Sequence, residues 1–187
     1  MYIQVHRKIT REAVRQELPE LFKRESRVIE FGNLSVDYRS WLWYQRQYHV
    51  DRIPFSPHAD AWEMGQLVFR EREMKIAQAL AAKKTRRAYR QLGALLHTTQ
   101  DFVSHSNYYM MNSENRTEFI TSLTEGSDMP EITLICSFSP WFIPRREDDG
   151  YSHKEFHKDN GEEEVYEGAL QASRIMLRKI RPLFFPE

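Results

Sequence analysis

The chain has 187 residues, of which 41% are hydrophobic and 29% charged, and its 27 basic and 27 acidic side chains give a formal net charge of zero. This length fits one domain with a sizeable core, and the charge balance argues against a nucleic-acid binder that relies on neutralising phosphates. The single cysteine, Cys136, excludes an intramolecular disulfide and a cysteine-rich zinc module, so histidine and carboxylate side chains would have to hold any metal.

Helical periodicity dominates the chain, together with the residues that begin and end helices. In chain order, helices are predicted over residues 11–18, 19–44, 59–82, 85–110, 114–125 and 162–180. Thr10 is a candidate N-cap of the first helix, and Gly126 and Pro182 are candidate helix ends. Residues 51–58 carry two prolines and indicate a loop, and residues 83–87 indicate a break or a solvated face. The only strand-like run is 131–138, so we expect an all-α, single compact domain over residues 1–187.

The ends of the chain and its apolar runs bear on location. No apolar run approaches the length of a membrane span, and residues 1–8 lack the apolar core of a secretory signal. We therefore expect a cytoplasmic protein without a transmembrane segment, or a secreted one if a leader has been removed.

Three candidate metal ligands, His97, Asp101 and His105, recur every four residues in the predicted helix 85–110. Residues four apart are neighbours on one helix face, so each adjacent pair can share an ion. The outer two are separated by roughly 12 Å of helix and cannot share one. The spacing therefore suggests two or more ions with Asp101 as a bridge, and imidazole with carboxylate suits Zn²⁺. On spacing alone, a solvated helix face is the competing interpretation.

Other histidines lie in loops or beside predicted helix ends, where a scaffold commonly presents ligands. They are His6, which precedes the first predicted helix, His58, His153 and His157, the last two close to Asp159. His49, between Tyr48 and Val50, is interpreted as a structural residue.

Five short segments resemble, in the right order, the zinc-dependent phospholipase C superfamily, and most closely its Het-C heterokaryon-incompatibility branch. The longest is Leu-Gly-x-x-Leu-His-x-x-Gln-Asp-x-x-x-His-Ser-Asn over residues 92–107. The other four are residues 5–13 with His6, the Gly-Asn-x-x-x-Asp-Tyr segment with Asp37, the His-x-Asp of residues 58–60, and the Ser-His and His-Lys-Asp pair within 152–159. Residues 110–150 are not covered.

The resemblance implies an all-helical fold around a trinuclear zinc cleft. The first ion would take Asp37, His58, His97 and Asp101, the second His6 with Asp101, and the third His105, His153 and a late carboxylate, preferably Asp159. His157 and Glu162 are the alternatives to Asp159. The secreted enzymes of the superfamily also use an N-terminal Trp, which this chain lacks near its start, so we expect two or three ions.

The resemblance favours a phosphodiester hydrolase of the phospholipase C type. Neighbouring zinc ions can polarise phosphoryl oxygens, supply hydroxide at neutral pH and stabilise the leaving oxygen. Asp37, which could orient the water, and Asp101, the bridge, are the catalytic candidates, and phospholipid is favoured over nucleic acid as substrate. One alternative is a single-strand-specific nuclease with a basic rim at Lys83, Lys84, Arg86 and Arg87. The other is a Het-C-like metal-binding protein without phosphoesterase activity. Nothing in the sequence indicates the oligomeric state.

Overall fold

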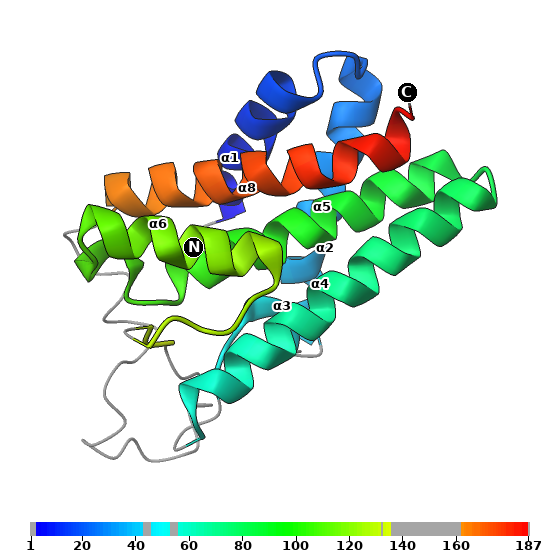
Figure 1. Cartoon of the computed structure of the whole chain (residues 1–187). Coiled ribbons are helices and arrows are strands. Elements are labelled where there is room, and N and C mark those ends of the chain that lie inside the picture. The colour runs from blue at the N-terminus through cyan, green and yellow to red at the C-terminus, as the bar shows by residue number, and fades with distance from the viewer. Residues whose placement is uncertain (1–2, 43–45, 53–55, 132, 136–161, 187) are drawn as a thin grey trace.

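The computed structural model describes residues 3–42, 46–52, 56–131, 133–135 and 162–186. Within them the chain forms seven α-helices and one 3₁₀ helix and no strand, which confirms the all-α prediction (Figure 1). The elements are α1 (Ile3–Glu17), α2 (Lys23–Leu42), α3 (Arg46–His49), α4 (His58–Ala81), α5 (Thr85–Ser104), the 3₁₀ helix η1 (Tyr108–Met110), α6 (Ser113–Glu125) and α8 (Glu162–Phe184).

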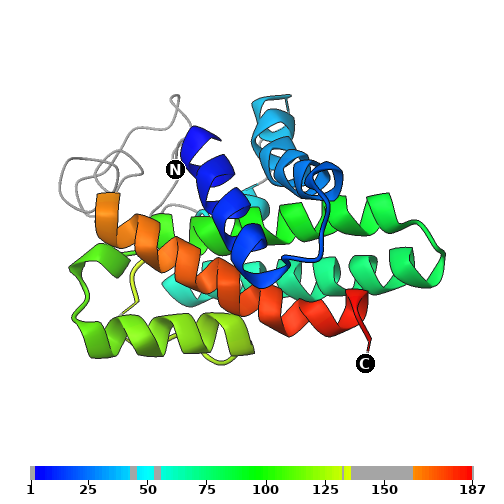
Figure 2. The same cartoon turned by 90° about the horizontal axis from the view of Figure 1, so that it is seen from above.

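Helix α5 is the centre of the packing. It contacts α1, α2, α3, α4 and α8, and every residue from Leu92 to Ser104 is buried. A helix that is covered on all sides presents every position to the interior, so its polar residues in this stretch must find partners inside the protein. Figures 1 and 2 show α4 and α5 as an antiparallel pair joined by a short turn, with α8 crossing them.

Helices α2 and α5 approach each other at two glycines. A Cβ atom on Gly93 would lie 2.0 Å from the carbonyl oxygen of Ile29, and one on Gly32 would lie 2.4 Å from that of Arg90. Beyond the two glycines, Asn33 of α2 faces His97 of α5. Both helices therefore continue in the same chain direction past this crossing. Their N-terminal turns therefore lie on one side of it, and Asn33, Asp37 and His97 lie on the other.

Ion pairs attach α1 to its neighbours. Glu30 of α2 accepts hydrogen bonds from Arg7 and Arg11. Glu17 accepts from Arg174 and Arg178 of α8, each at 2.7 Å. The hydrogen bond from Arg178, more than any other influence, lowers the pKa of Glu17 to about 2, so this carboxylate stays charged throughout the physiological range.

The helix bounds agree best with the sequence where caps and periodicity act locally. Helix α4 matches the predicted 59–82, and α6 ends at Gly126, whose φ of 78° places it in the left-handed region that glycine adopts readily. The start of the first helix was predicted wrongly. Helix α1 begins at Ile3, and Thr10 is a buried residue within it. The Thr10 hydroxyl accepts hydrogen bonds from Asn33 and Gln100 and does not cap the helix. His6 is therefore in the helix and does not precede it.

Three further differences concern the middle and the end of the chain. In the strand-like run 131–138, Ile135 forms an isolated antiparallel bridge with Ser106, and residues 132 and 136–138 lie outside the described part. Pro182 lies inside the last turns of α8, which continues to Phe184. Helix α3 was not predicted. None of the helices in the described ranges is both long and apolar enough to cross a membrane.

The glycine crossing yields a stability prediction. Replacing Gly93 with Ala should lower the free energy of unfolding by about 2 kcal/mol or more, because the new methyl group would press on backbone atoms that cannot rotate away. Urea unfolding followed by circular dichroism measures the change. A variant as stable as the wild type would show that the helices separate at little cost.

Candidate metal centre

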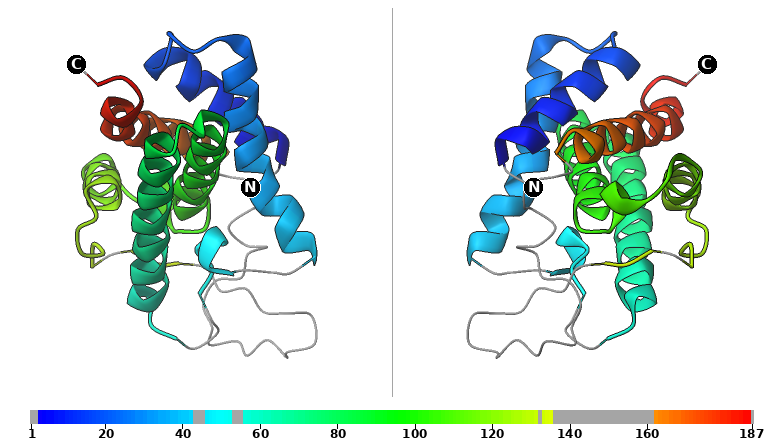
Figure 3. Two further views of the ribbon diagram at one scale, coloured as in Figure 1. Left: turned by 90° about the vertical axis from the view of Figure 1, so that its right-hand side faces the viewer. Right: turned by 90° about the vertical axis from the view of Figure 1, so that its left-hand side faces the viewer.

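Six side chains with metal-binding atoms converge from separate elements. They are His6 of α1, Asp37 of α2, His49 of α3, His97 and Asp101 of α5, and His105 directly after α5. All except Asp37 are buried. Asp37 retains 22% of its side-chain exposure, so it marks the solvent side of the cluster. Figure 3 shows the ribbon of the short helix α3 beside α4 and α5, which it contacts.

Asp101 is the centre of this cluster, because its two carboxylate oxygens face different imidazoles. Oδ1 lies 3.2 Å from His6 Nε2 and 3.8 Å from His105 Nε2. Oδ2 lies 2.9 Å from His49 Nδ1 and 3.0 Å from His97 Nε2. His97 and His105 therefore approach opposite oxygens of the residue halfway between them. A carboxylate with one oxygen toward each of two donor pairs has the arrangement needed to bridge two ions.

The outer nitrogens of three imidazoles face hydrogen-bond acceptors. His6 Nδ1 lies 2.7 Å from Gln100 Oε1, and His105 Nδ1 lies 2.6 Å from the carbonyl oxygen of His49. His97 Nδ1 lies 3.4 Å from Asn33 Oδ1. These nitrogens must carry the hydrogen in order to donate, so in the neutral rings each inner Nε2 presents a lone pair. Metal-binding histidines are commonly held in this way by their second nitrogen.

The amide orientations that set these tautomers follow from the surrounding network. Gln100 donates through Nε2 to Thr10 and Ser173, which leaves its Oε1 to accept. Asn33 donates through Nδ2 to Thr10 and Gln100, which leaves its Oδ1 to accept from His97. Gln100 and Asn33 therefore each have a defined donor end and a defined acceptor end.

Charges in the centre favour a bound cation. Burial, more than any other influence, lowers the pKa of His97 to about 4, so this ring is neutral at physiological pH. Burial raises the pKa of Asp101, but the surrounding imidazoles together outweigh it and hold that pKa well below its usual range. A neutral His97 Nε2 and an ionised Asp101 oxygen are both acceptors, yet they lie only 3.0 Å apart. His49 Nδ1 lies 2.9 Å from that oxygen and 3.2 Å from His97 Nε2, so either a hydrogen on His49 or a cation at this point would offset the repulsion.

The spacing of the donor atoms also fits a metal ion. Ligand atoms bound tetrahedrally at zinc distances of about 2.0–2.1 Å are separated by roughly 3.3 Å. His6, Asp37 and His97 each offer a donor atom within 4.8 Å of the other two, and so do His49, His97 and Asp101. In addition, Asp37 Oδ2 is buried without a hydrogen-bond partner among the described residues. An unsatisfied buried carboxylate oxygen beside imidazoles is the feature that a ligand to an ion would show.

His49 and Asp51 belong to the centre and were missed from the sequence. Helix α3 is held against α5 by the hydrogen bond from Thr98 Oγ1 to the carbonyl oxygen of Tyr48. Val50 then has φ of 57°, a costly conformation for a β-branched residue. This turn directs His49 toward Asp101 and brings Asp51 Oδ1 to 3.1 Å from His105 Nδ1. The available signal was a second His-x-Asp, at residues 49–51.

Of the other predicted ligands, only His58 has a described side chain. His58 begins α4, and its Nδ1 accepts a hydrogen bond from the backbone N–H of Ile135 at 2.8 Å. His58 belongs to neither of the two donor groups, which are His6, Asp37 and His97, and His49, His97 and Asp101. His153, His157 and Asp159 lie outside the described residues, as does the side chain of Glu162. The ligand set inferred for a third ion therefore remains a prediction.

Comparison with known proteins gives one result. The family model of the VWA7 N-terminal domain matches residues 5–133. The chain belongs to the VWA7 N-terminal domain family. No curated protein and no solved structure matches the chain. The segment that matches the VWA7 N-terminal domain contains all six converging side chains and Asp51, and it ends before His153 and Asp159.

The network around Gln100 generates a test of the centre's architecture. Gln100 is fully buried and bonded to four side chains, so Gln100→Leu should destabilise the protein by about 2–4 kcal/mol by leaving those partners unsatisfied. Thermal or urea unfolding checks this. Gln78→Leu on the exposed side of α4 is the matched control and should change stability little. Equal effects of the two substitutions would contradict the network.

Proposed function

We propose that this centre binds two zinc ions bridged by Asp101 and that the protein hydrolyses phosphodiester bonds. The observation that carries the proposal is the set of inner imidazole nitrogens aimed at the two oxygens of one buried carboxylate. Nitrogen and oxygen donors without a thiolate suit zinc. The resemblance to the zinc-dependent phospholipase C superfamily supports the reaction class and favours a phospholipid substrate.

In the proposed hydrolysis, the buried side chains would hold the ions and the partly exposed Asp37 would act on the water. Zinc ions, when bound, polarise a phosphoryl oxygen and lower the pKa of water. Asp37, the partly exposed member of the cluster, is placed to accept the proton of the attacking water. The water oxygen forms the new bond to phosphorus, and the ester oxygen leaves with its electron pair and takes up a proton. Asn33 and Gln100 keep the imidazoles of His97 and His6 oriented throughout.

A second candidate is a metal-binding protein without phosphoesterase activity. It is favoured by the burial of the cluster, since His6, His97, Asp101 and His105 are each at most 2% exposed. A closed set of protein ligands is typical of structural metal sites, whereas catalytic sites keep a position open. Turnover therefore decides between the two candidates, because both require bound metal.

The first test combines metal content with turnover. Protein purified without chelator should contain about two zinc ions per chain by elemental analysis and should cleave a phosphodiester in a panel of bis-p-nitrophenyl phosphate, phosphatidylcholine and single-stranded DNA. Asp101→Asn should lose most of the zinc and all measurable turnover, because the bridge loses its charge. Asp60→Asn, on an exposed carboxylate of α4, is the control and should retain both.

The outcomes of this test separate the two candidates. Protein with no more zinc than the Asp101→Asn variant would overturn the metal centre itself. Zinc that depends on Asp101, with no turnover on any substrate of the panel, would overturn the hydrolase and support the metal-binding protein.

A second test compares His49 with His58. The sequence predicts His58 as a metal ligand, whereas the structure places His49 beside Asp101. His49→Ala should weaken zinc binding by about 10-fold or more, because it removes a donor 2.9 Å from Asp101. His58→Ala should leave zinc affinity within about twofold, since His58 lies outside both donor groups. Competition with a chromophoric chelator measures both affinities. The reverse order would favour the ligand set implied by the family resemblance.

A further inference from the structure

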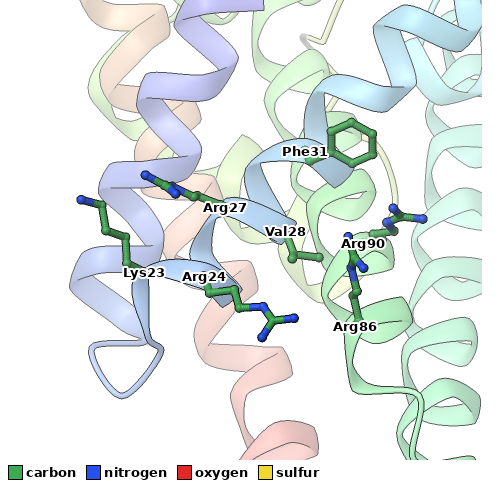
Figure 4. Close-up of a pocket in the computed structure, with 7 residues that line it drawn as sticks. All are labelled: Lys23, Arg24, Arg27, Val28, Phe31, Arg86 and Arg90. Atoms are coloured by element: carbon green, nitrogen blue, oxygen red, sulfur yellow. The ribbon is translucent and has the colours of Figure 1, made fainter.

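A basic groove lies between the first turns of α2 and α5, across the glycine crossing from the metal centre. Its volume is about 570 Å³. It is lined by Lys23, Arg24, Arg27, Val28, Phe31, Arg86 and Arg90. Figure 4 shows that the first five come from α2 and the two arginines 86 and 90 from α5. Of the predicted basic rim at residues 83, 84, 86 and 87, only Arg86 lines this groove.

The five cations of the basic groove lack neutralising partners. All five are exposed, and within the described part of the chain none of them forms an ion pair with a carboxylate. The guanidinium of Arg90 lies 5.3 Å from the ring centre of Phe31, which is itself 53% exposed. The molecule has zero net charge, so this concentration of positive charge is local.

The position of these cations on their helices adds to the positive potential. The N-terminus of an α-helix carries a partial positive charge, so basic side chains in its first turns are unfavourable. Here Lys23 and Arg24 open α2, whose first turn also contains the acidic Glu25, and Arg86 lies in the first turn of α5, which contains no acidic residue. Both helix ends lie on the same side of the crossing, so the groove combines two helix dipoles with five side-chain charges. An anion would relieve this repulsion.

We propose that the basic groove binds a small ligand carrying two or more phosphate groups. Guanidinium groups match phosphate oxygens in a bidentate manner, and several phosphates are needed to engage cations on two helices. The groove volume falls within the range of about 300–1,000 Å³ that is usual for small-molecule sites. A nucleic acid is less well suited, because the groove cations gather around one hollow rather than along a line that could follow a phosphate backbone.

The basic groove is separate from the metal centre. Arg90 and His97 are seven residues apart, or roughly 10 Å along α5, and none of the groove residues belongs to the donor groups. The proposal therefore goes beyond the hydrolase activity and does not depend on it. The phosphates could belong to a free molecule or to the head group of a phosphoinositide, and the two sources are distinguished below.

The test uses inorganic tripolyphosphate as the probe, in isothermal titration calorimetry at low salt with the full chain. Substituting Gln for Arg24, Arg86 and Arg90 together should weaken binding by about 100-fold, since each lost contact of an exposed charge accounts for up to about fivefold. The control carries Gln at Lys83, Lys84 and Arg87, which are exposed at the same end of the molecule and outside the groove. It has the same net charge and should bind within about threefold of the wild type.

Two further arms complete the test. Sedimentation with phosphatidylcholine vesicles, with and without phosphatidylinositol bisphosphate, identifies a lipid head group as the source if binding requires the bisphosphate and the groove arginines. Tripolyphosphate binding without vesicle binding identifies a free ligand. Absence of tripolyphosphate binding, or equal losses in the two triple variants, overturns the proposal. Single-stranded DNA that binds more tightly than tripolyphosphate through the same arginines would also overturn it, in favour of nucleic acid.

Discussion

The burial of one carboxylate, that of Asp101, is the constraint on which the rest of the structure depends. An ionised carboxylate in the interior is costly unless donor groups or a bound cation offset its charge. Here the surrounding groups are imidazoles from α1, α3 and α5 and from the residue after α5. Their orientation depends in turn on the amides of Asn33 and Gln100. Much of the polar interior is thus arranged around one charge, and disturbing any layer leaves buried groups unsatisfied.

Local signals in the sequence explain the part of the fold that could be predicted. Helices α4 and α6 follow from periodicity and end residues that act within a few positions, such as Gly126 with its left-handed φ. The stripe of His97, Asp101 and His105 could be predicted because four-residue spacing determines which side chains are neighbours on a helix, and His105 directly follows the end of α5. Both predictions concern residues within one or two helical turns of each other, whose relative positions do not depend on the rest of the fold.

Longer-range interactions explain what could not be predicted. Thr10 has the chemistry of a helix cap, yet its hydroxyl is used inside α1 by Asn33 and Gln100, residues distant in sequence. The position of His49, rather than His58, beside Asp101 has a similar cause. The two His-x-Asp segments are alike in sequence, and they differ because Thr98 holds α3 against α5 and Val50 adopts a left-handed conformation. No local pattern contains that information. The resemblance to the zinc-dependent phospholipase C superfamily has the same ambiguity, because it rests on short motifs such as His-x-Asp.

The glycine crossing of α2 and α5 has a consequence for how the protein tolerates sequence change. At this crossing, a side chain would meet backbone atoms directly, as the 2.0 Å approach to the Ile29 carbonyl shows. The separation of the two helices is therefore set by main-chain contact and depends little on the sizes of neighbouring core residues. Substitutions elsewhere in the core can accumulate while Asp37 and His97 keep their relative positions. The two glycines thus make the geometry of the centre robust to mutational drift in the surrounding core.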